Sequence, residues 1–156
     1  MDLSDAELER LRRSGITLDS GGRFIHEGEE VRHPGLRAAL WRWLDQEPDG
    51  RFVLRLDDHR FVYLDVEDAP HVVTSLRFEG GRALGRLADG SEEPIDLGTV
   101  RLGEGGVAYC RVKGGRFAAR LSSGAWAALA DHIVDDGGAF YLVDGGRRHR
   151  LGPPPT

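Results

Sequence analysis

Cysteine, lysine and long apolar runs are scarce in this sequence of 156 residues. Cys110 is the one cysteine, which excludes an intrachain disulfide and is typical of a protein in a reducing cytoplasm. No apolar run approaches the ~20 residues that span a bilayer, and the acidic, polar N-terminal residues do not resemble a secretory signal. We therefore expect a cytoplasmic protein with no membrane partner.

An excess of basic charge is also missing. The formal net charge is −5, and Lys113 is the one lysine among 21 basic residues. A phosphate backbone binds basic surfaces, so we expect no nucleic-acid partner. The one basic cluster, at 147–150, is short, and we interpret it as a solvated hairpin end.

Glycine, in contrast, is abundant, and the tripeptide Gly-Gly-Arg recurs four times. The four sites begin at Gly21, Gly80, Gly114 and Gly145. Each precedes an apolar or alternating run, and paired glycines tolerate the positive φ of a tight turn. Their unequal spacing argues against a solenoid, so they predict turns that separate short strands.

The start of the chain carries the signals of a helix. Ser4 is a good N-cap, and Glu7 follows three residues later as in a capping box. Gly15 offers a C-terminal stop. We therefore predict an N-terminal helix within residues 1–19.

Two further helices are predicted from apolar spacing. Pro34 is a good first helical residue, and the helix that it opens should end before Pro48. A third helix should begin near Ser122 and continue with helical spacing through Ile133 and Val134. Short strands and turns fill the intervening segments.

These elements predict an α+β fold of two small lobes, each a mostly antiparallel sheet with one packed helix, plus the N-terminal helix. We place the first lobe at 20–75 and the second, with a C-terminal hairpin and a proline-rich tail, at 76–156. Segments 22–66 and 115–151 share the order strand, helix, hairpin. This order is explained by two similar lobes or, about as well, by coincidence among glycine-rich motifs.

Four segments resemble a bacterial family known as domain of unknown function 1285 (DUF1285). They are Gly22–Gly28, Val66–Pro70, Gly115–Leu121 and the closing hairpin from Gly145 to Gly152. Together they span roughly residues 20–152 in the family's order. The chain departs from the family at His71, where an aromatic residue is usual. The resemblance implies a two-lobed α+β protein with a groove between the lobes, and it implies no established reaction.

The densest acidic group lies at the end of a predicted strand and comprises Asp65, Glu67 and Asp68. Asp65 and Glu67 point to the same face of a strand, so these carboxylates could bind a divalent cation or act as acid and base. The alternative is an exposed strand end, because Asp68 precedes Ala-Pro in good turn chemistry.

The histidines do not show the spacing of a zinc site, and no cofactor is predicted. His26 matches the family motif within a strand, and His71 follows the acidic group. Each is a candidate site residue, although a structural role is the simpler interpretation. Cys110 shares a strand face with Ala108 and Val112, which predicts a buried, unreactive thiol.

Arg116 and Arg120 are predicted on the same face of one strand. Two guanidinium groups at this spacing could hold a carboxylate or a phosphate. They could equally pair with the acidic strand end at Asp65 and Glu67.

We therefore expect a non-enzymatic cytoplasmic binding or signalling module that takes a small anionic ligand or a protein partner at the groove between lobes. The ligand-binding candidates are His26, Glu67, Asp68, His71, Arg116 and Arg120. One alternative is a metal-assisted hydrolase that uses Asp65, Glu67 and Asp68 with a histidine. Another is a purely structural interaction protein.

Overall fold

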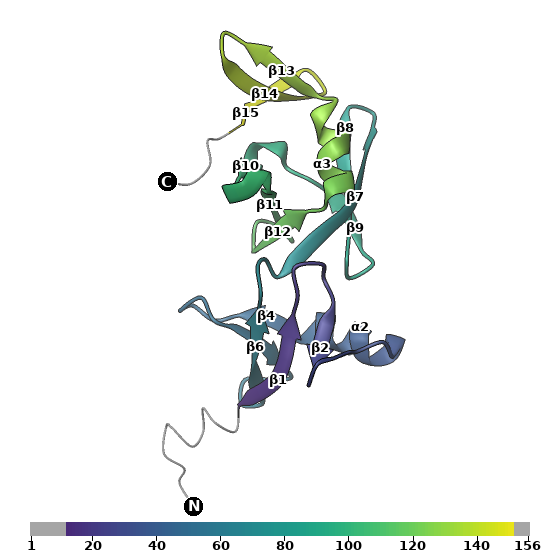
Figure 1. Cartoon of the computed structure of the whole chain (residues 1–156), viewed down its shortest axis with the longest axis vertical. Coiled ribbons are helices and arrows are strands. Elements are labelled where there is room, and N and C mark those ends of the chain that lie inside the picture. Colours follow the sequence, from purple (N-terminus) through teal and green to yellow (C-terminus); the bar gives the residue numbers. More distant parts are fainter. Residues whose placement is uncertain (1–11, 152–156) are drawn as a thin grey trace, which may run out of the picture. The chain divides into compact units, whose positions relative to one another are not determined.

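The computed structural model describes residues 12–151 and divides the chain into two compact units, Met1–Asp68 and Ala69–Thr156 (Figure 1). The expected boundary after residue 75 falls inside strand β7 (His71–Glu79), which belongs wholly to the second unit. No helix of the described residues has the length and apolar character needed to cross a membrane.

The first unit is built on a six-stranded sheet, here called sheet A. Its strands are β1 (Arg13–Leu18), β2 (Phe24–His26), β3 (Glu29–Glu30), β4 (Leu44–Gln46), β5 (Phe52–Arg55) and β6 (Phe61–Val66). They lie in the order β3-β2-β1-β6-β5-β4, and only the central β1–β6 pair is parallel. The sheet is thus mostly antiparallel, as predicted.

Helix α2 (Pro34–Trp43) packs on one face of sheet A. His33 caps it, since its Nδ1 accepts the Leu36 N–H at 3.1 Å, and Pro34 occupies the first turn as expected. Buried leucines and one phenylalanine fill the space between helix and sheet. They are Leu18, Phe24, Leu40, Leu44, Leu54 and Leu64. Burial of each such side chain contributes about 1.5–3 kcal/mol, which fixes this face as the core.

The structure does not confirm the predicted N-terminal helix. Residues 1–11 lie outside the described residues, and Arg13–Leu18 form strand β1 instead of the end of a helix. Gly15 does adopt a positive φ of 70°, but within a strand. A glycine at positive φ suits a helix stop and a β-bulge equally, and pairing with β2 and β6 decides between them.

The second unit contains another six-stranded sheet, sheet B. Besides β7, its strands are β8 (Arg82–Leu87), β9 (Glu92–Pro94), β10 (Arg101–Leu102), β11 (Ala108–Val112) and β12 (Phe117–Leu121). The order is β10-β11-β12-β7-β8-β9, again with a single parallel pair, β12–β7, at the centre. Short 3-10 turns η1 (Leu97–Thr99) and η2 (Glu104–Gly106) flank β10.

Helix α3 (Ser123–Ala130) packs against β7 and β12 (Figure 1). Its predicted cap is confirmed, because the Ser122 hydroxyl accepts the Ala125 N–H at 3.1 Å. The helix is shorter than predicted, since Ile133 and Val134 begin a new strand. Apolar residues at helical spacing fit a half-buried strand as well when a partner strand is present.

A third sheet, sheet C, follows α3 in the second unit. Its antiparallel strands are β13 (Ile133–Asp136), β14 (Ala139–Asp144) and β15 (Arg147–Arg150). The α+β class is therefore confirmed in outline. In the first unit the three strands after the helix join the main sheet, whereas in the second they form this separate sheet.

The Gly-Gly-Arg sites lie in turns, as predicted, but in turns of different kinds. Gly80-Gly81 and Gly145-Gly146 are two-residue hairpin loops in which all four glycines have positive φ. Gly114-Gly115 lies in a longer loop, and Gly21-Gly22 lies in a turn held by the Asp19 carboxylate.

Candidate functional site

A polar hollow of about 500 Å³ lies on the outer face of sheet A, opposite the α2 core. We call it the outer hollow. Its lining residues are Arg13, Ser14, Gly15, Arg51, Tyr63 and Asp65. The alternation of β6 explains this placement, because Tyr63 and Asp65 point away from the core on which Leu64 packs. The outer hollow thus belongs to the first unit alone.

A bulge in β1 shapes the outer hollow. Arg13 pairs with Tyr63 and Thr17 with Asp65, so β1 uses more residues than β6 over the same stretch. Gly15 takes the positive φ in this bulge. Ser14 replaces part of the lost ladder, because its hydroxyl donates to the Tyr63 carbonyl oxygen at 2.6 Å and accepts the Ile16 N–H at 3.0 Å.

The two guanidinium groups of the outer hollow differ in how firmly they are held. Arg51 lies with its Cζ 4.3 Å from the centre of the Tyr63 ring and bonds the Asp49 carboxylate at 3.0 Å. The hydrogen bond from the backbone N–H of Arg51 lowers the pKa of Asp49, and the hydrogen bond from the Arg51 side chain adds a smaller effect in the same direction. Arg13 is exposed and forms no ion pair within residues 12–151.

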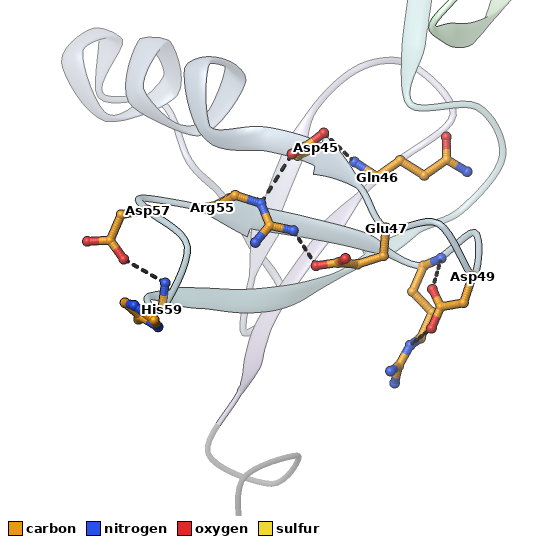
Figure 2. Close-up of polar contacts among 8 residues, drawn as sticks. Asp45, Gln46, Glu47, Asp49, Arg55, Asp57 and His59 are labelled. Atoms are coloured by element: carbon orange, nitrogen blue, oxygen red, sulfur yellow. Dashed lines mark hydrogen bonds and ion pairs between the residues drawn. The ribbon is translucent and has the colours of Figure 1, made fainter.

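A second arginine network lies beside the outer hollow in the same unit. Figure 2 shows the Arg55 guanidinium between the Asp45 and Glu47 carboxylates; its Nε lies 3.2 Å from Asp45 Oδ2, and its Nη2 bonds Glu47. The hydrogen bond to Glu47 and, to a smaller extent, that to Asp45 raise the pKa of Arg55. Arg55 also lies 5.1 Å from the Phe61 ring centre, on which Arg12 stacks at 3.7 Å. The outer face is therefore an arginine–aromatic surface on which Asp45, Glu47 and Asp49 are bonded to arginines.

Two solved structures of known fold are similar to this chain. A DUF1285 family protein from Silicibacter pomeroyi DSS-3 superposes with a TM-score of 0.74 at 18% identity over 89% of this chain and 80% of that one. A second, from Shewanella baltica OS155, gives a TM-score of 0.60 at 17% identity over 74% of this chain and 90% of that one. The chain has the DUF1285 fold. The resemblance drawn from the sequence is thus confirmed at the level of fold, whereas no family model and no curated protein matches.

Within this DUF1285 fold, two of the residues singled out in the sequence lie at the β1 bulge. Asp65 is exposed and lines the outer hollow. His26, on β2, lies beside Gly15, since a Cβ at position 15 would be 3.8 Å from His26 Cδ2. Its Nε2 is 4.0 Å from Glu27 Oε1.

Glu67 and Asp68 lie beyond the end of β6 and are exposed. The Glu67 N–H donates to the Leu18 carbonyl oxygen, which continues the pairing of β1 with β6. Neither residue lines the outer hollow. Among the described residues, no group of three histidine, cysteine or acidic side chains lies close enough together to hold a metal ion. These residues therefore offer no set of metal ligands for the hydrolase alternative.

His71 lies in the second unit and is buried, with its ring tilted against Phe117 at 5.1 Å. Burial lowers its pKa to about 4; nearby Asp89 opposes this shift and Lys113 adds to it. Lys113 itself bonds Asp89 at 2.8 Å and the Ser91 hydroxyl at 2.9 Å. His71 is therefore a neutral core side chain at pH 7.

The expectation that Arg116 and Arg120 share a strand face is wrong. Arg116 lies in the turn before β12, with its Cζ 4.8 Å from the Phe117 ring centre. Arg120 lies on β12, half-buried, paired with Tyr109 and Val72. The longer loop around Gly114-Gly115 delays the start of the strand past Arg116. That these residues line a groove with His26 stays a prediction.

The sequence analysis missed Arg13 and Arg51 as site residues. Arg13 falls in the predicted N-terminal helix, and Arg51 lies between the end of the second predicted helix and the strand that follows. A signal for Arg51 was present, because Asp-Gly-Arg before an apolar run is typical of a hairpin turn. No local signal revealed that β1 and β6, which are far apart in the sequence, would pair.

Proposed function

We propose that this protein is a binding module for a small anionic ligand and that the outer hollow is its binding site. The observation that carries the proposal is the pair of guanidinium groups, Arg13 and Arg51, at one hollow of about 500 Å³. That volume falls within the roughly 300–1,000 Å³ typical of small-molecule sites. Guanidinium groups bind carboxylate or phosphate oxygens through paired, charge-assisted hydrogen bonds.

The other lining residues narrow the class of ligand. The Tyr63 ring, already covered by Arg51, offers an aromatic edge. Asp65 is an exposed carboxylate at the same hollow and would repel a compact polyanion. A ligand that carries carboxylate groups and a hydroxyl or amine donor satisfies both the arginines and Asp65. Amino acids and hydroxycarboxylates have this combination.

Binding suits the outer hollow better than covalent catalysis. The Ser14 hydroxyl, the one alcohol of the six lining residues, donates to the Tyr63 carbonyl oxygen. None of the described lining residues is a histidine or cysteine that could act as base or nucleophile. A cytoplasmic location and a signalling role remain predictions that accompany this proposal.

The test is a titration of the ¹⁵N-labelled full chain, followed by NMR, with glutamate, malate and inorganic phosphate. We expect glutamate or malate to shift the Gly15 and Tyr63 amide signals saturably. Arg13→Gln and Arg51→Gln should each weaken binding about tenfold or more, because each removes a charged hydrogen bond. Arg32→Gln is the matched control, since Arg32 is exposed in the same unit and bonds Glu30 at 3.2 Å.

Two results would overturn the proposal. One is the absence of any saturable shift at Gly15 and Tyr63 with glutamate and malate. The other is binding that Arg13→Gln and Arg51→Gln leave as strong as Arg32→Gln does. Unchanged far-UV circular dichroism of the variants establishes that a loss of binding is not a loss of fold.

A further inference from the structure

Two of the Gly-Gly-Arg turns meet in the second unit. Residues Gly80–Arg82 join β7 to β8, and residues Gly145–Arg147 join β14 to β15. A Cβ at position 81 would lie 3.0 Å from the Gly145 Cα, and one at position 145 would lie 3.2 Å from the Gly81 carbonyl oxygen. The two backbones therefore lie close together at Gly81 and Gly145, where an added Cβ would be tightly packed.

This contact brings Arg82 and Arg147 to the same surface depression. One hollow of about 360 Å³ is lined by the two glycine turns with Arg82, Arg147 and Asp144. A second, of about 280 Å³, shares those three side chains and extends over Ile95 toward η1. We call the two together the twin-turn groove.

The arginines of the twin-turn groove have unused hydrogen-bonding capacity. Both are exposed, and neither guanidinium forms an ion pair or hydrogen bond with a residue of 12–151. Some exposed arginines of the described residues are ion-paired instead, for example Arg23 with Asp19 at 2.8 Å and Arg148 with Asp136 at 2.9 Å.

The twin-turn groove also holds two acids, Asp144 and Asp96, which balance its two arginines in formal charge. Within the glycine hollow, however, Asp144 is the one acid beside two guanidinium groups. Asp96, at the second hollow, accepts the Gly98 N–H at 2.9 Å, and His149 lines the same hollow with another polar nitrogen. In a chain of net charge −5, the glycine hollow therefore has more positive than negative side chains.

We propose that the twin-turn groove binds the phosphate group of a small phosphate monoester. A phosphate presents three terminal oxygens, so two guanidinium groups can each bind it through two hydrogen bonds. A single carboxylate has two oxygens and can form such a paired contact with only one guanidinium group. The second hollow, with apolar Ala83, Ile95 and Leu97 beside His149, has room for the organic part of the ester. This site is separate in residues and unit from the outer hollow and does not depend on it.

The experiment is an NMR titration of the ¹⁵N-labelled full chain with glycerol 3-phosphate, and in parallel with glycerate, which carries one carboxylate. We expect glycerol 3-phosphate to shift the amide signals of Gly80, Gly81, Gly145 and Gly146 saturably. Glycerate should bind about tenfold more weakly or not at all. Arg82→Gln and Arg147→Gln should each weaken glycerol 3-phosphate binding about tenfold or more.

Arg23→Gln is the matched control, because Arg23 follows the same Gly-Gly sequence but lies in the first unit. It should leave glycerol 3-phosphate binding unchanged. Both groove arginines are exposed, so their variants should keep the thermal melting temperature of the parent chain.

Three results would overturn the inference. The first is the absence of saturable shifts at the four glycines. The second is equal binding of glycerate and glycerol 3-phosphate. The third is binding that Arg82→Gln and Arg147→Gln leave as strong as Arg23→Gln does. Glutamate shifts at Gly15 are read from separate signals, so failure at one site is distinguishable from failure at the other.

Discussion

The hydroxyl of Ser14 donates a hydrogen bond of 2.6 Å to the carbonyl oxygen of Tyr63, which is 49 residues further along the chain. The bond spans the point at which the β1–β6 pairing is interrupted. A side chain therefore supplies a contact that the backbone ladder cannot make there. The outer hollow depends on this contact, since Ser14 and Tyr63 both line it.

Ser14→Ala should destabilise the chain by about 1–2 kcal/mol, because the half-buried Tyr63 carbonyl loses its donor. Urea unfolding monitored by circular dichroism measures this. Ser123→Ala, at an exposed position in the first turn of α3, should change the free energy of unfolding by less than about 0.5 kcal/mol. Equal stability of the two variants would contradict the role given to Ser14.

Gly15→Ala should cost about 1–2 kcal/mol, since residue 15 has a φ of 70° that disfavours an L side chain. Gly124→Ala is the contrasting control in α3, where the added Cβ would meet nothing closer than 4.0 Å. Helix propensity predicts that this substitution stabilises the chain by up to about 1 kcal/mol. The two alanine substitutions should therefore move the midpoint of urea unfolding in opposite directions.

Arg55→Met should destabilise the first unit at pH 7, because it leaves the Asp45 and Glu47 carboxylates side by side without their shared cation (Figure 2). The loss should shrink in about 1 M salt, where the Debye length is about 3 Å and the repulsion between the two carboxylates is screened. Arg32→Met, in an ion pair whose guanidinium is 84% exposed, should have little effect at either salt concentration. A loss from Arg55→Met that is the same in low and high salt would contradict the electrostatic explanation.

His71 should make the free energy of unfolding decrease as the pH drops below neutral. Its pKa is about 4 in the folded chain, against 6.5 for an unperturbed histidine. The unfolded state therefore binds the proton first as pH drops, and stability present above pH 6.5 is lost progressively toward pH 4. The full shift corresponds to about 3 kcal/mol.

Urea unfolding of the parent and of His71→Leu at several pH values tests this. Leucine has nearly the same volume and does not titrate, so the variant should lose less stability than the parent between pH 6.5 and pH 4. His26→Gln is the matched control, because it removes an exposed histidine of the first unit. Parallel curves for the parent and His71→Leu would refute the prediction.

Cys110 should be unreactive in the folded chain. It is buried on β11, and burial, with a smaller contribution from Glu93, raises its pKa to about 12. The nucleophilic thiolate is therefore absent near neutral pH. Iodoacetamide at pH 8 should label the chain once in guanidinium chloride and not in buffer, as mass spectrometry would show; rapid labelling in buffer would contradict the burial of this thiol.

Local chemistry was enough to locate several features from the sequence. Pro34 and Ser122 opened helices as their cap chemistry predicts, and the Gly-Gly-Arg sites lie in turns. The placement of Cys110 on a buried strand face followed from simple alternation. Each of these depends on neighbours only a few residues away, so the sequence alone contains the cause.

Other features required knowledge of distant partners. Gly15 looks like a helix stop until β1 pairs with β6, and Ile133 continues a helical pattern until β14 pairs with it. Arg116 and Arg120 have strand-like spacing, but the loop at Gly114-Gly115 extends through Arg116, so only Arg120 of the two lies in the strand. In each case a tertiary contact outweighed a weak local preference.

The Gly-Gly-Arg repeats show most clearly which features depend on local sequence and which depend on distant contacts. The sequence by itself determined that glycine pairs make turns, because only glycine adopts positive φ without cost. Tertiary structure decided that Gly81 would pack on Gly145 and so bring Arg82 and Arg147 to one groove. It likewise placed Arg13 beside Arg51 at the outer hollow. Turns depend on local backbone energy, whereas a site depends on which distant segments pack together.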